Sequence, residues 1–488
     1  MSASSRPPDT TNSSESAPLR DPSADAAADA EGPRAWQLGR RLAGLTPSGR
    51  ARVPLSWAFY DFGDTIYSAA IISTAMGLWL TDPSRLGNDA GQLVFSIAIA
   101  LSVGLNALVS PILGALSDRA GRRMPFLLFF TVVTIVFESI IGPTPALVGA
   151  LLFVIANFGY QASLIYFDAT LAVVSLPRTR GAVSGLGVGI GYMGTIFMAV
   201  LLIILGTEHP EPIFPIAGLL FAIFATPVFL FVREPRPAVS RRLTAADVVS
   251  AFGQFGAVVE HARSIPHLGR FLLGRFFYTD ALNTVVVVMS VLAVRAMGLT
   301  QTQWLMLLLV VTIVAIVMSF AWGRIVDRVG PKRTLMAVLV DWLVGLTIGI
   351  VAVGMPGTTL GLALFILAGA LVGTGMGGIH VSDRVFMIRL SPRERLGEFF
   401  GLYGLVGKGS QVVGQLLYGV VVFVFYERLG NGAYQLAVLS LIGAMLVGAW
   451  LIWPVSDHWR GRAAERLAGE DDVGTVPLPF DQPAIAES

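Results

Sequence analysis

Long apolar stretches alternate with short polar loops over most of this chain. Twelve of these stretches are each long enough to cross the hydrocarbon core of a bilayer, which takes about 20 helical residues. In chain order they cover about residues 55–80, 92–117, 124–142, 146–174, 181–205, 212–232, 268–294, 302–325, 333–354, 358–388, 397–425 and 433–454. The pattern predicts an all-α membrane protein with twelve transmembrane helices.

The remaining segments are polar and divide the chain. Residues 1–50 and 457–488 contain no long apolar run, so we expect two disordered tails and no cleavable signal peptide. Between them, the long loop 233–267 separates the sixth apolar stretch from the seventh. We therefore expect two membrane-embedded units, residues 51–232 and residues 268–456.

The loop 233–267 carries a helix signal of its own. Thr244 and Asp247 have the spacing of a capping box at the start of a helix. Hydrophobic residues then fall on one helical face, at Val248, Phe252, Phe255 and Val259. This pattern favours an amphipathic helix lying at the inner membrane surface, with a solvated linker as the alternative.

The two expected units repeat each other. The loop Gly114-Ala-Leu-Ser-Asp-Arg-Ala-Gly-Arg-Arg returns 209 residues later as Gly323-Arg-Ile-Val-Asp-Arg-Val-Gly-Pro-Lys-Arg. Asp168 and Asp383 each lie nine residues before a Pro-Arg-x-Arg segment, and they are 215 residues apart. We infer a six-plus-six duplication that gives two pseudo-symmetric six-helix bundles. Two such bundles are how a carrier forms a central site that opens to either side of the membrane.

Composition supports lipid as the main solvent and excludes several classes of protein. Only 14% of the residues are charged, against about 25% in an average soluble domain. Cysteine is absent and the net charge is +2, so we expect no disulfide, no cysteine-based metal site and no nucleic-acid partner. The sequence has no nucleotide-binding loop, no metal-binding cluster and no Ser-His-Asp set, so we expect no cofactor and no enzyme activity.

Lysine and arginine indicate the orientation in the membrane. If the amino end lies inside, the loops on the outer side hold three basic residues, Arg85, Arg295 and Arg428, and the inner loops hold most of the others. Positive residues favour the cytosolic side, so we expect a multi-pass protein with both termini in the cytosol. The strong preference for arginine over lysine is typical of a GC-rich bacterial genome, which indicates a bacterial inner membrane.

The repeated loop resembles the signature loop of the major facilitator superfamily. Three further stretches narrow the resemblance: residues 57–62 (Trp-Ala-Phe-Tyr-Asp-Phe), residues 180–192 and residues 398–408. Together they resemble the branch related to the vacuolar amino-acid effluxers of fungi, over about residues 52–456. The resemblance implies the major facilitator fold, alternating access and a small polar solute such as an amino acid. The chain departs from that branch at Gly63-Asp64, where an acid stands in the usual Asn-rich patch.

We therefore expect a secondary active transporter that works as a monomer in the lipid bilayer on a small-molecule substrate, with protons as the candidate coupling ion. Two alternatives stay open. The pattern Ser117-Asp118-Arg119, followed by Gly-Arg-Arg-x-Pro125, is shared with cation-coupled sugar symporters. The other alternative is a membrane sensor or scaffold that has a carrier-like body and does not transport.

Charged residues inside apolar spans are costly and usually face a cavity or a partner. Lys408 lies eleven residues into its span, in a chain that has one other lysine. A lysine is a compact charge that can be released, so we expect Lys408 to bind a carboxylate of the substrate or of the protein during transport. A permanent salt bridge is the alternative. The candidate partners at similar depth are Asp61, Asp64 and Asp280.

Aromatic and acidic residues cluster on the first and seventh spans, which the resemblance places around a central cavity. Burial disfavours the charged form of a carboxylate, so Asp64 or Asp280 could carry a coupling proton unless it pairs with Lys408 or Arg275. The amide side chains could bind a polar solute or simply join helices. The expected substrate- or proton-binding residues are Tyr60, Asp61, Asp64, Asn157, Gln161, Asp280, Lys408 and Gln411.

Asp118 and Asp327 stand at the inner ends of helices, where a carboxylate can accept hydrogen bonds from the first amides of a facing helix. The expected partners are Gly397 and Gly181. These contacts would hold an inner gate closed, whereas the neighbouring arginines could serve only as topology signals. The expected gating residues are Gly114, Asp118, Arg119, Arg122, Asp168, Gly323, Asp327, Arg328 and Asp383.

Other polar residues within the spans are harder to place. Glu138 and Asp341 fall on spans that the resemblance puts at the periphery, so we do not count them among the expected functional residues. His380 and the pair Asp383-Arg384 lie in the inner half of the tenth span. They could form a charge cluster near the gate or bind the solute.

Overall fold

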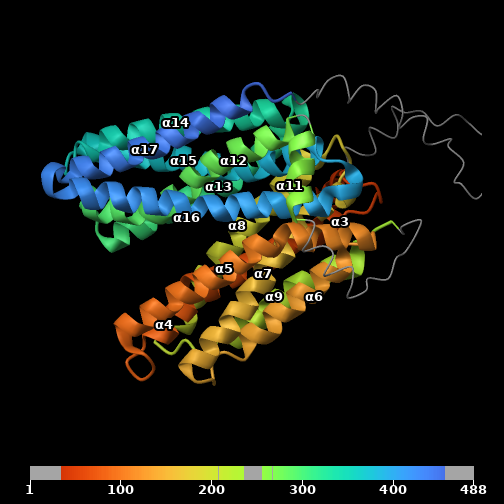
Figure 1. Ribbon diagram of the computed structural model, residues 1–488, viewed down its shortest axis with the longest axis horizontal. Coiled ribbons are helices and arrows are strands. Elements are labelled where there is room, and N and C mark those ends of the chain that lie inside the picture. Colours follow the sequence, from red (N-terminus) through yellow and green to blue (C-terminus); the bar gives the residue numbers. More distant parts are fainter. Residues whose placement is uncertain (1–33, 207, 236–254, 266, 457–488) are drawn as a thin grey trace, which may run out of the picture.

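The computed structural model describes residues 34–206, 208–235, 255–265 and 267–456 (Figure 1). Within these ranges the regular elements are helices, as the sequence predicts. The first half contains α2 (Arg34–Ala43), α3 (Arg52–Tyr67), the π-helical segment η1 (Ser68–Ala75), α4 (Met76–Thr81), α5 (Gly87–Ala120), α6 (Met124–Ser139), α7 (Ala146–Val174), α8 (Arg180–Leu205) and α9 (Ile213–Phe231). The second half contains α11 (Phe255–Ser264), α12 (Leu268–Val291), η2 (Leu292–Ala296), α13 (Gln301–Val329), α14 (Pro331–Val353), α15 (Thr359–Leu390), η3 (Arg393–Arg395), α16 (Leu396–Leu429) and α17 (Asn431–Ile452).

Eight of the described helices are long and apolar enough to cross a membrane. They are α5, α7, α8, α9, α13, α14, α15 and α17. The shorter helix α6 is also apolar. The other expected spans, 55–80, 268–294 and 397–425, coincide with α3 to α4, with α12 and with α16, which are helical but are not among the eight.

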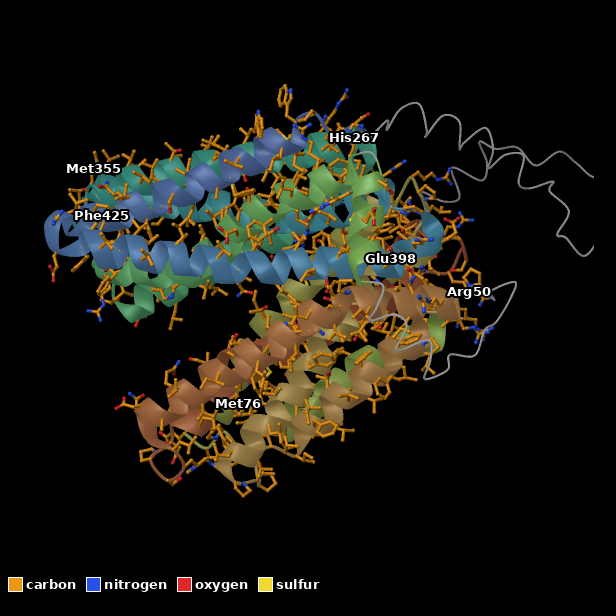
Figure 2. The ribbon with its side chains drawn as sticks, viewed as in Figure 1. Arg50, Met76, His267, Met355, Glu398 and Phe425 are labelled. Carbon is orange, nitrogen blue, oxygen red and sulfur yellow. The ribbon has the colours of Figure 1, made fainter. Side chains whose placement is uncertain are left out.

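The helices gather into two groups. In the first group α3 packs on α8 and α9, and α7 packs on α5 and α6; in the second, α15 packs on α13 and α14, and α17 packs on α12 and α16. Figure 1 shows the first group in red to yellow and the second in green to blue. The groups meet at one end of the molecule and diverge toward the other. Figure 2 labels Glu398 where they meet, and Met76 and Phe425 on the diverging arms.

Two helix pairs make most of the contact between the groups. They are α5 with α16 and α8 with α13. Glycines allow these backbones to approach closely: a Cβ atom at Gly114 or Gly401 on one pair, or at Gly185 or Gly323 on the other, would overlap main-chain atoms of the facing helix. Small residues at helix crossings are the usual means of close packing within a membrane. The repeated loops lie at this end of the molecule, which we call the loop end.

The outer surface of both groups is apolar. Large hydrophobic side chains on α8, α9, α16 and α17 are more than half exposed, among them Ile203, Leu219, Phe423 and Trp450. Such a surface is unfavourable in water and suits contact with lipid acyl chains. The buried aromatic side chains instead face the interior of the groups, where Trp57 stacks on Phe167 with ring centroids 4.5 Å apart.

The expected linker helix is seen in part. Its predicted start, at Thr244 and Asp247, lies outside the described residues, as do Val248 and Phe252. The helix α11 covers Phe255–Ser264 and contacts α5 of the first group as well as α12 and α16 of the second. It therefore bridges the two groups at the loop end (Figure 1).

Candidate functional site

The first repeated loop holds α5 against the start of α16. Both oxygens of the Asp118 carboxylate accept hydrogen bonds from main-chain amides, one from Gly397 at 3.0 Å and the other from Glu398 at 2.7 Å. Because these amides begin a helix, they lack partners within it and lie at the positive end of its dipole. This pairing is the one expected from the sequence. We call Asp118 with its two amides the first clamp.

The second repeated loop makes the corresponding contact on the other side of the interface. Asp327, near the end of α13, accepts hydrogen bonds from the amides of Gly181 and Ala182 at the start of α8, each at 2.7 Å. This second clamp also joins the two helix groups, and its partner is again the one expected. The glycines expected to gate, Gly114 and Gly323, lie in the same interfaces, against Gly397 and Gly181.

The first clamp has additional support. Arg123 Nη2 donates to Asp118 at 2.9 Å, and the main-chain amides of Arg123 and Met124 donate to the carboxylate of Glu234 at 2.8–3.0 Å. Glu234 thus caps α6 and ties the segment that follows α9 to the repeated loop. Of the arginines expected to gate, Arg119 is half-buried, whereas Arg122 and Arg328 are exposed.

A cavity of about 800 Å³ lies at the loop end, lined by both groups. Its polar lining includes Asp118, Arg123, Arg180, Glu234 and Glu394. Within the described ranges there is no cluster of three or more His, Cys, Asp or Glu residues that could hold a metal ion.

An ion pair joins the groups deeper in the interface. Arg384 Nε on α15 lies 2.9 Å from Asp168 Oδ1 on α7, and both side chains are largely buried, 11% and 15% exposed. The rings of Trp57 and Phe167 lie 5.7 and 5.8 Å from Arg384 Cζ, within the range of cation–π attraction. Asp168 was expected to gate. Arg384 was noted in the sequence but was not assigned to the site.

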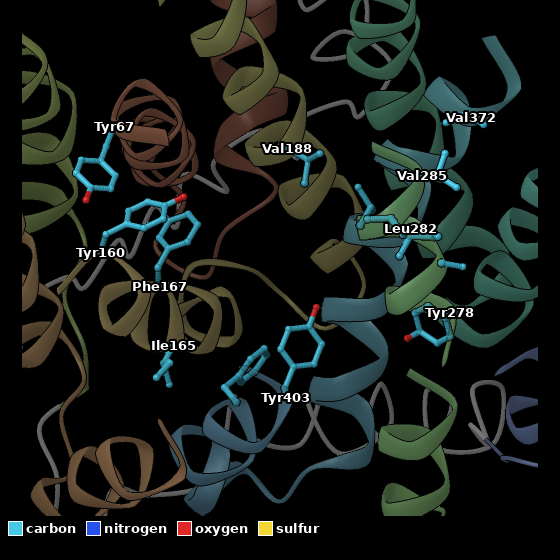
Figure 3. Packing of buried hydrophobic residues seen from close by; sticks show 14 of the residues in the cluster. Tyr67, Tyr160, Ile165, Phe167, Val188, Tyr278, Leu282, Val285, Val372 and Tyr403 are labelled. Carbon is cyan, nitrogen blue, oxygen red and sulfur yellow. The ribbon is translucent and has the colours of Figure 1, made fainter. Parts of the chain in front are cut away.

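Asp383, the repeat equivalent of Asp168, lies in a different setting. Its carboxylate pairs with Arg275 Nε at 3.0 Å and accepts hydrogen bonds from the hydroxyls of Tyr278 at 2.7 Å and Tyr403 at 3.1 Å. Arg275 Cζ also lies 3.5 Å from the Tyr403 ring centroid. All four side chains belong to the second group, so this cluster does not join the two groups. Figure 3 labels the two tyrosines, Tyr278 and Tyr403.

Lys408 does cross the interface, but its partners differ from those expected. Its ammonium group donates to the Asn106 side chain on α5 and, at 3.3 Å, to the main-chain carbonyl of Gln161 on α7. Among the described residues it forms no ion pair with Asp61, Asp64 or Asp280. The expected pairing is therefore wrong for this conformation, because α16 turns Lys408 toward α5 and α7. The carboxylate that acts on Lys408 electrostatically is Asp168.

The two acids of α3 lie close to the inter-group ion pair. Asp61 and Asp64 are buried, 8% and 5% exposed, and both interact electrostatically with Arg384 and Asp168. Gly191 on α8 has no side chain and so leaves room for the Asp61 carboxylate. A Cβ atom at position 191 would lie 3.1 Å from Asp61 Oδ2. Asp64 Oδ1 is buried with no hydrogen-bond partner among the described residues.

Tyr60, the third expected site residue of α3, is committed to the interior of the first group. Its hydroxyl shares a 2.7 Å hydrogen bond with Thr131 on α6, and its ring stacks on Phe167 with centroids 4.8 Å apart. Figure 3 shows Phe167 on α7 with Tyr160 and Tyr67 close by. Tyr60 therefore packs against residues of the first group and makes no contact of its own with the inter-group ion pair.

The buried charged residues around Asp168 and Arg384 form what we call the charged layer. Three other expected site residues do not belong to it. Asp280 packs on α16 at Gly414, six positions beyond Lys408, and lies within the second group. Asn157 donates to Ser102 at 2.7 Å inside the first group, which is the helix-joining role that was the alternative. Gln411 is half-buried on α16.

Comparison with known proteins gives a consistent result. The family model described as "Vacuole effluxer Atg22 like" matches residues 93–464. The uncharacterized MFS-type transporter YxiO of Bacillus subtilis is 28% identical over 408 residues, which cover 80% of this chain and 92% of YxiO. Autophagy-related protein 22 of Coccidioides immitis is 22% identical over 468 residues, covering 80% of this chain and 76% of that protein. The crystal structure of the human organic anion transporter MFSD10 superposes with a TM-score of 0.65 at 16% identity, covering 86% of this chain and 100% of MFSD10. The resemblance read from the repeated loops is thereby confirmed.

Proposed function

This chain belongs to the Atg22-like family of vacuole effluxers, and on that premise we propose that it is a proton-coupled carrier of a small polar solute. Its relatives are transporters of the major facilitator type, and its exposed surface is apolar. In the proposed arrangement twelve transmembrane helices form two six-helix bundles, residues 51–232 and 268–456. The protein lies in a bacterial inner membrane with both termini in the cytosol. The two bundles expose a shared site alternately to either side.

The two clamps are the observation that carries this proposal. Both join helices of different groups, and both lie at the loop end, whereas the groups diverge at the opposite end (Figure 1). A hydrogen bond to a charged group contributes about 1.5–3 kcal/mol, so a clamp of two such bonds contributes roughly 3–6 kcal/mol. Inverting a two-state population from 99:1 to 1:99 takes about 5.5 kcal/mol. The free energy that a clamp contributes is therefore comparable to the free energy needed to decide which end of the molecule is closed.

Release of the clamps would open the loop end. The freed carboxylates and amides would then meet water, which recovers part of the lost hydrogen bonding. The inter-group contacts of Arg384 and Lys408 would have to break in the same motion, because their partners lie on the opposite group. Gate and solute site are thus coupled through the rigid movement of one group against the other.

The balance of positive and negative groups in the charged layer supports a proton as the coupling ion. Among the described residues, the layer holds four carboxyl groups, Asp61, Asp64, Asp168 and Asp383, and three side chains that are cations at neutral pH, Arg275, Arg384 and Lys408. The imidazole of His380 lies near the two arginines and is not counted as a cation. An unpaired charge in such surroundings is costly. Asp61 and Asp64 stand three positions apart, on the same face of α3. We place one proton on this pair, where it removes the excess negative charge.

The proposal is tested by reconstitution in liposomes with a panel of amino acids and sugars, with and without a pH gradient. We expect uptake of an amino acid that an inward proton gradient increases. Lys408→Ala should abolish this flux, because Lys408 holds the interface at the site. Lys332→Ala is the matched control, since the only other lysine lies at the loop end and donates to the Trp453 carbonyl. Equal flux in wild type and Lys408→Ala, or uptake of sugars alone, would overturn the proposal.

A further inference from the structure

The helix that follows the repeated loop starts differently in the two halves. In the first half, the carboxylate of Glu234 accepts hydrogen bonds from the amides of Arg123 and Met124, at 2.8–3.0 Å. The repeat offset of 209 residues makes Lys332 and Arg333 the equivalents of these two residues, at the start of α14. Their amides are the second and third of a helix, so the helix itself supplies no acceptor for them.

A cavity of about 560 Å³ lies at the start of α14. It is lined by residues of α14 and of the segment that follows α17: Lys332, Arg333, Met336, Trp453, Pro454 and Ser456. Lys332 Nζ donates to the main-chain carbonyl of Trp453 at 2.8 Å, which joins the two walls. In the part of the chain that the structure describes, no acidic residue lines this cavity, so its lining carries a net positive charge. Such a lining favours an anion.

The cavity lies on the outer surface of the second helix group. Figure 1 shows α14 and α17 side by side along the edge of this group that lies away from the first group. Trp453 is 72% exposed, and Trp450, one helical turn earlier, is 67% exposed. Arg270 Cζ on α12 lies 5.9 Å from the centre of the Trp450 ring. Exposed tryptophans beside basic residues are typical of the level at which phospholipid headgroups lie.

We propose that this cavity binds the phosphate group of an anionic phospholipid, with Lys332 and Arg333 as its basic ligands. The headgroup lies against the start of α14, as Glu234 lies against the start of α6. Main-chain amides and the helix dipole at such a start favour a phosphate, and a guanidinium group can donate to two of its oxygens. The inference concerns lipid and not the transported solute, so it does not depend on the proposed transport function.

The apolar part of the lining favours a lipid over a soluble anion. Met336, Pro454 and the exposed Trp453 border the cavity, and their carbon atoms suit the glycerol and upper acyl groups of a phospholipid. A hydrated soluble anion gains nothing from this surface. A zwitterionic phospholipid carries an ammonium group of its own, which the two basic side chains repel. The favoured ligand is therefore a lipid whose headgroup has a net negative charge.

The bound headgroup has a structural role that the chain fills by itself in the first half. Glu234 belongs to the segment after α9 and joins it to the first repeated loop. The equivalent segment after α17 offers the Trp453 carbonyl to Lys332, and within the described residues it brings no carboxylate to the cavity. The lipid phosphate supplies that negative charge from outside the chain.

The test measures binding of dioleoyl phosphatidylglycerol and dioleoyl phosphatidylcholine to the purified full-length protein in a neutral detergent, by native mass spectrometry. We expect the anionic lipid to bind at least about tenfold more tightly. It should also raise the thermal unfolding temperature more at equal concentration, because a ligand of the folded state stabilises that state. Equal binding of the two lipids would overturn the proposal.

Variants test the two basic ligands. Lys332→Gln/Arg333→Gln should abolish the preference for phosphatidylglycerol. The matched pair Arg263→Gln/Arg324→Gln removes two exposed charges on α11 and α13, outside the cavity, and should keep the preference. Equal loss in both pairs would show attraction by overall charge and overturn the site. If the first pair fails to fold, Arg333→Gln alone decides, since that side chain is exposed: it should weaken phosphatidylglycerol binding at least about threefold, and unchanged binding would overturn the proposal.

Two further probes distinguish other occupants of the cavity. Glycerol 3-phosphate has the phosphate chemistry without acyl chains, and stabilisation equal to that by phosphatidylglycerol would mean a soluble anion and overturn the lipid. Asp457, the next acid in the sequence, lies outside the described residues. Asp457→Asn should leave phosphatidylglycerol binding unchanged, whereas a gain would mean that the chain's own acid competes for the cavity and would overturn the proposal. The flux control Lys332→Ala is measured in phosphatidylcholine liposomes, which offer the cavity no anionic lipid.

Discussion

Asp168 and Asp383 occupy equivalent places in the two halves of the chain, yet their surroundings differ. Asp168 pairs across the interface with Arg384 and is 15% exposed at its side chain. Asp383 pairs within its own group with Arg275, receives two tyrosine hydroxyls and is 2% exposed. Duplication has kept the residue and its position on the helix, whereas the packing has placed one copy in a contact between the two helix groups and the other in a contact within one group.

The clamps show the opposite behaviour. Asp118 and Asp327 also derive from the duplication, and both still hold two amides at the start of a helix in the other group. The residues that support them differ: Arg123 and Glu234 reinforce the first clamp, whereas Arg180 and Arg389 act electrostatically on Asp327 in the second. The equivalent helix α14 begins at Pro331 with no side-chain cap. The two halves are thus symmetric at Asp118 and Asp327 and asymmetric at Asp168 and Asp383.

The largest expected effect comes from the buried acid of the second group. Asp383→Asn leaves Arg275 without its charged partner, and loss of one member of a buried ion pair costs about 3–5 kcal/mol. We expect a clear fall in the thermal unfolding temperature of the purified protein. Asp168→Asn should lower it less, because Arg384 also interacts with Asp61 and Asp64.

Asp341→Asn is the control for this comparison. It replaces a half-buried acid of the same group whose contact with Thr374 an amide oxygen can also make. A larger loss of stability in Asp168→Asn than in Asp383→Asn would show that the ion pair across the interface, rather than the one within the group, holds the fold.

The second prediction concerns the two clamps and uses the absence of cysteine from the chain. Ser110 on α5 and Ser319 on α13 are fully buried beside the facing glycines Gly401 and Gly185. A cysteine at either position should react with a maleimide only when the loop end opens. Asp118→Asn exchanges an acceptor oxygen for an amide group that cannot accept, which costs about 1.5–3 kcal/mol, so labelling of Ser110→Cys should rise.

Labelling of both reporters tests whether the groups move as rigid bodies. If they do, Asp118→Asn and Asp327→Asn should each raise labelling at Ser110→Cys and at Ser319→Cys. Asp89→Asn, an exposed acid in the first turn of α5, should raise neither. A clamp variant that affects only its own reporter would mean that the two interfaces open separately.

A glycine substitution should act in the same direction by steric means. Gly114→Ala places a methyl group against the main chain of Gly397, and overpacking of this kind costs about 1–3 kcal/mol. We expect it to raise labelling of Ser110→Cys. Gly104→Ala on the same helix is the matched control, because a Cβ atom there meets no atom within 4 Å. Equal labelling in the two variants would exclude close packing at Gly114 as a condition of closure.

The smallest expected effect comes from Glu234, which caps α6 beside the first clamp. Glu234→Gln removes the charge that caps α6, a change of about 0.3–1 kcal/mol for an acid at a helix start. Labelling at Ser110→Cys should rise slightly, and less than in Asp118→Asn. If Glu234→Gln raised labelling of Ser110→Cys as much as Asp118→Asn does, the segment after α9 would control the gate as strongly as the clamp itself.

The sequence by itself determined the class of fold, the duplication, the family and the clamp residues. These follow from hydrophobic length, from a repeated motif and from the free amides that every helix start presents. A pattern along the chain reports how far along a helix a residue lies, so it also placed Lys408, Asp61 and Asp64 within the spans and away from the loops.

Only the tertiary structure decided which way each buried charge faces. It directed Lys408 to Asn106 and Gln161, moved Asp280 out of the charged layer, and assigned Arg384 and Arg275 to two different carboxylates. The reason is physical: contacts between helices hundreds of residues apart depend on the rotation of each helix about its axis. That rotation is set by the packing of both groups together and leaves little trace in a chain that is apolar on nearly every face.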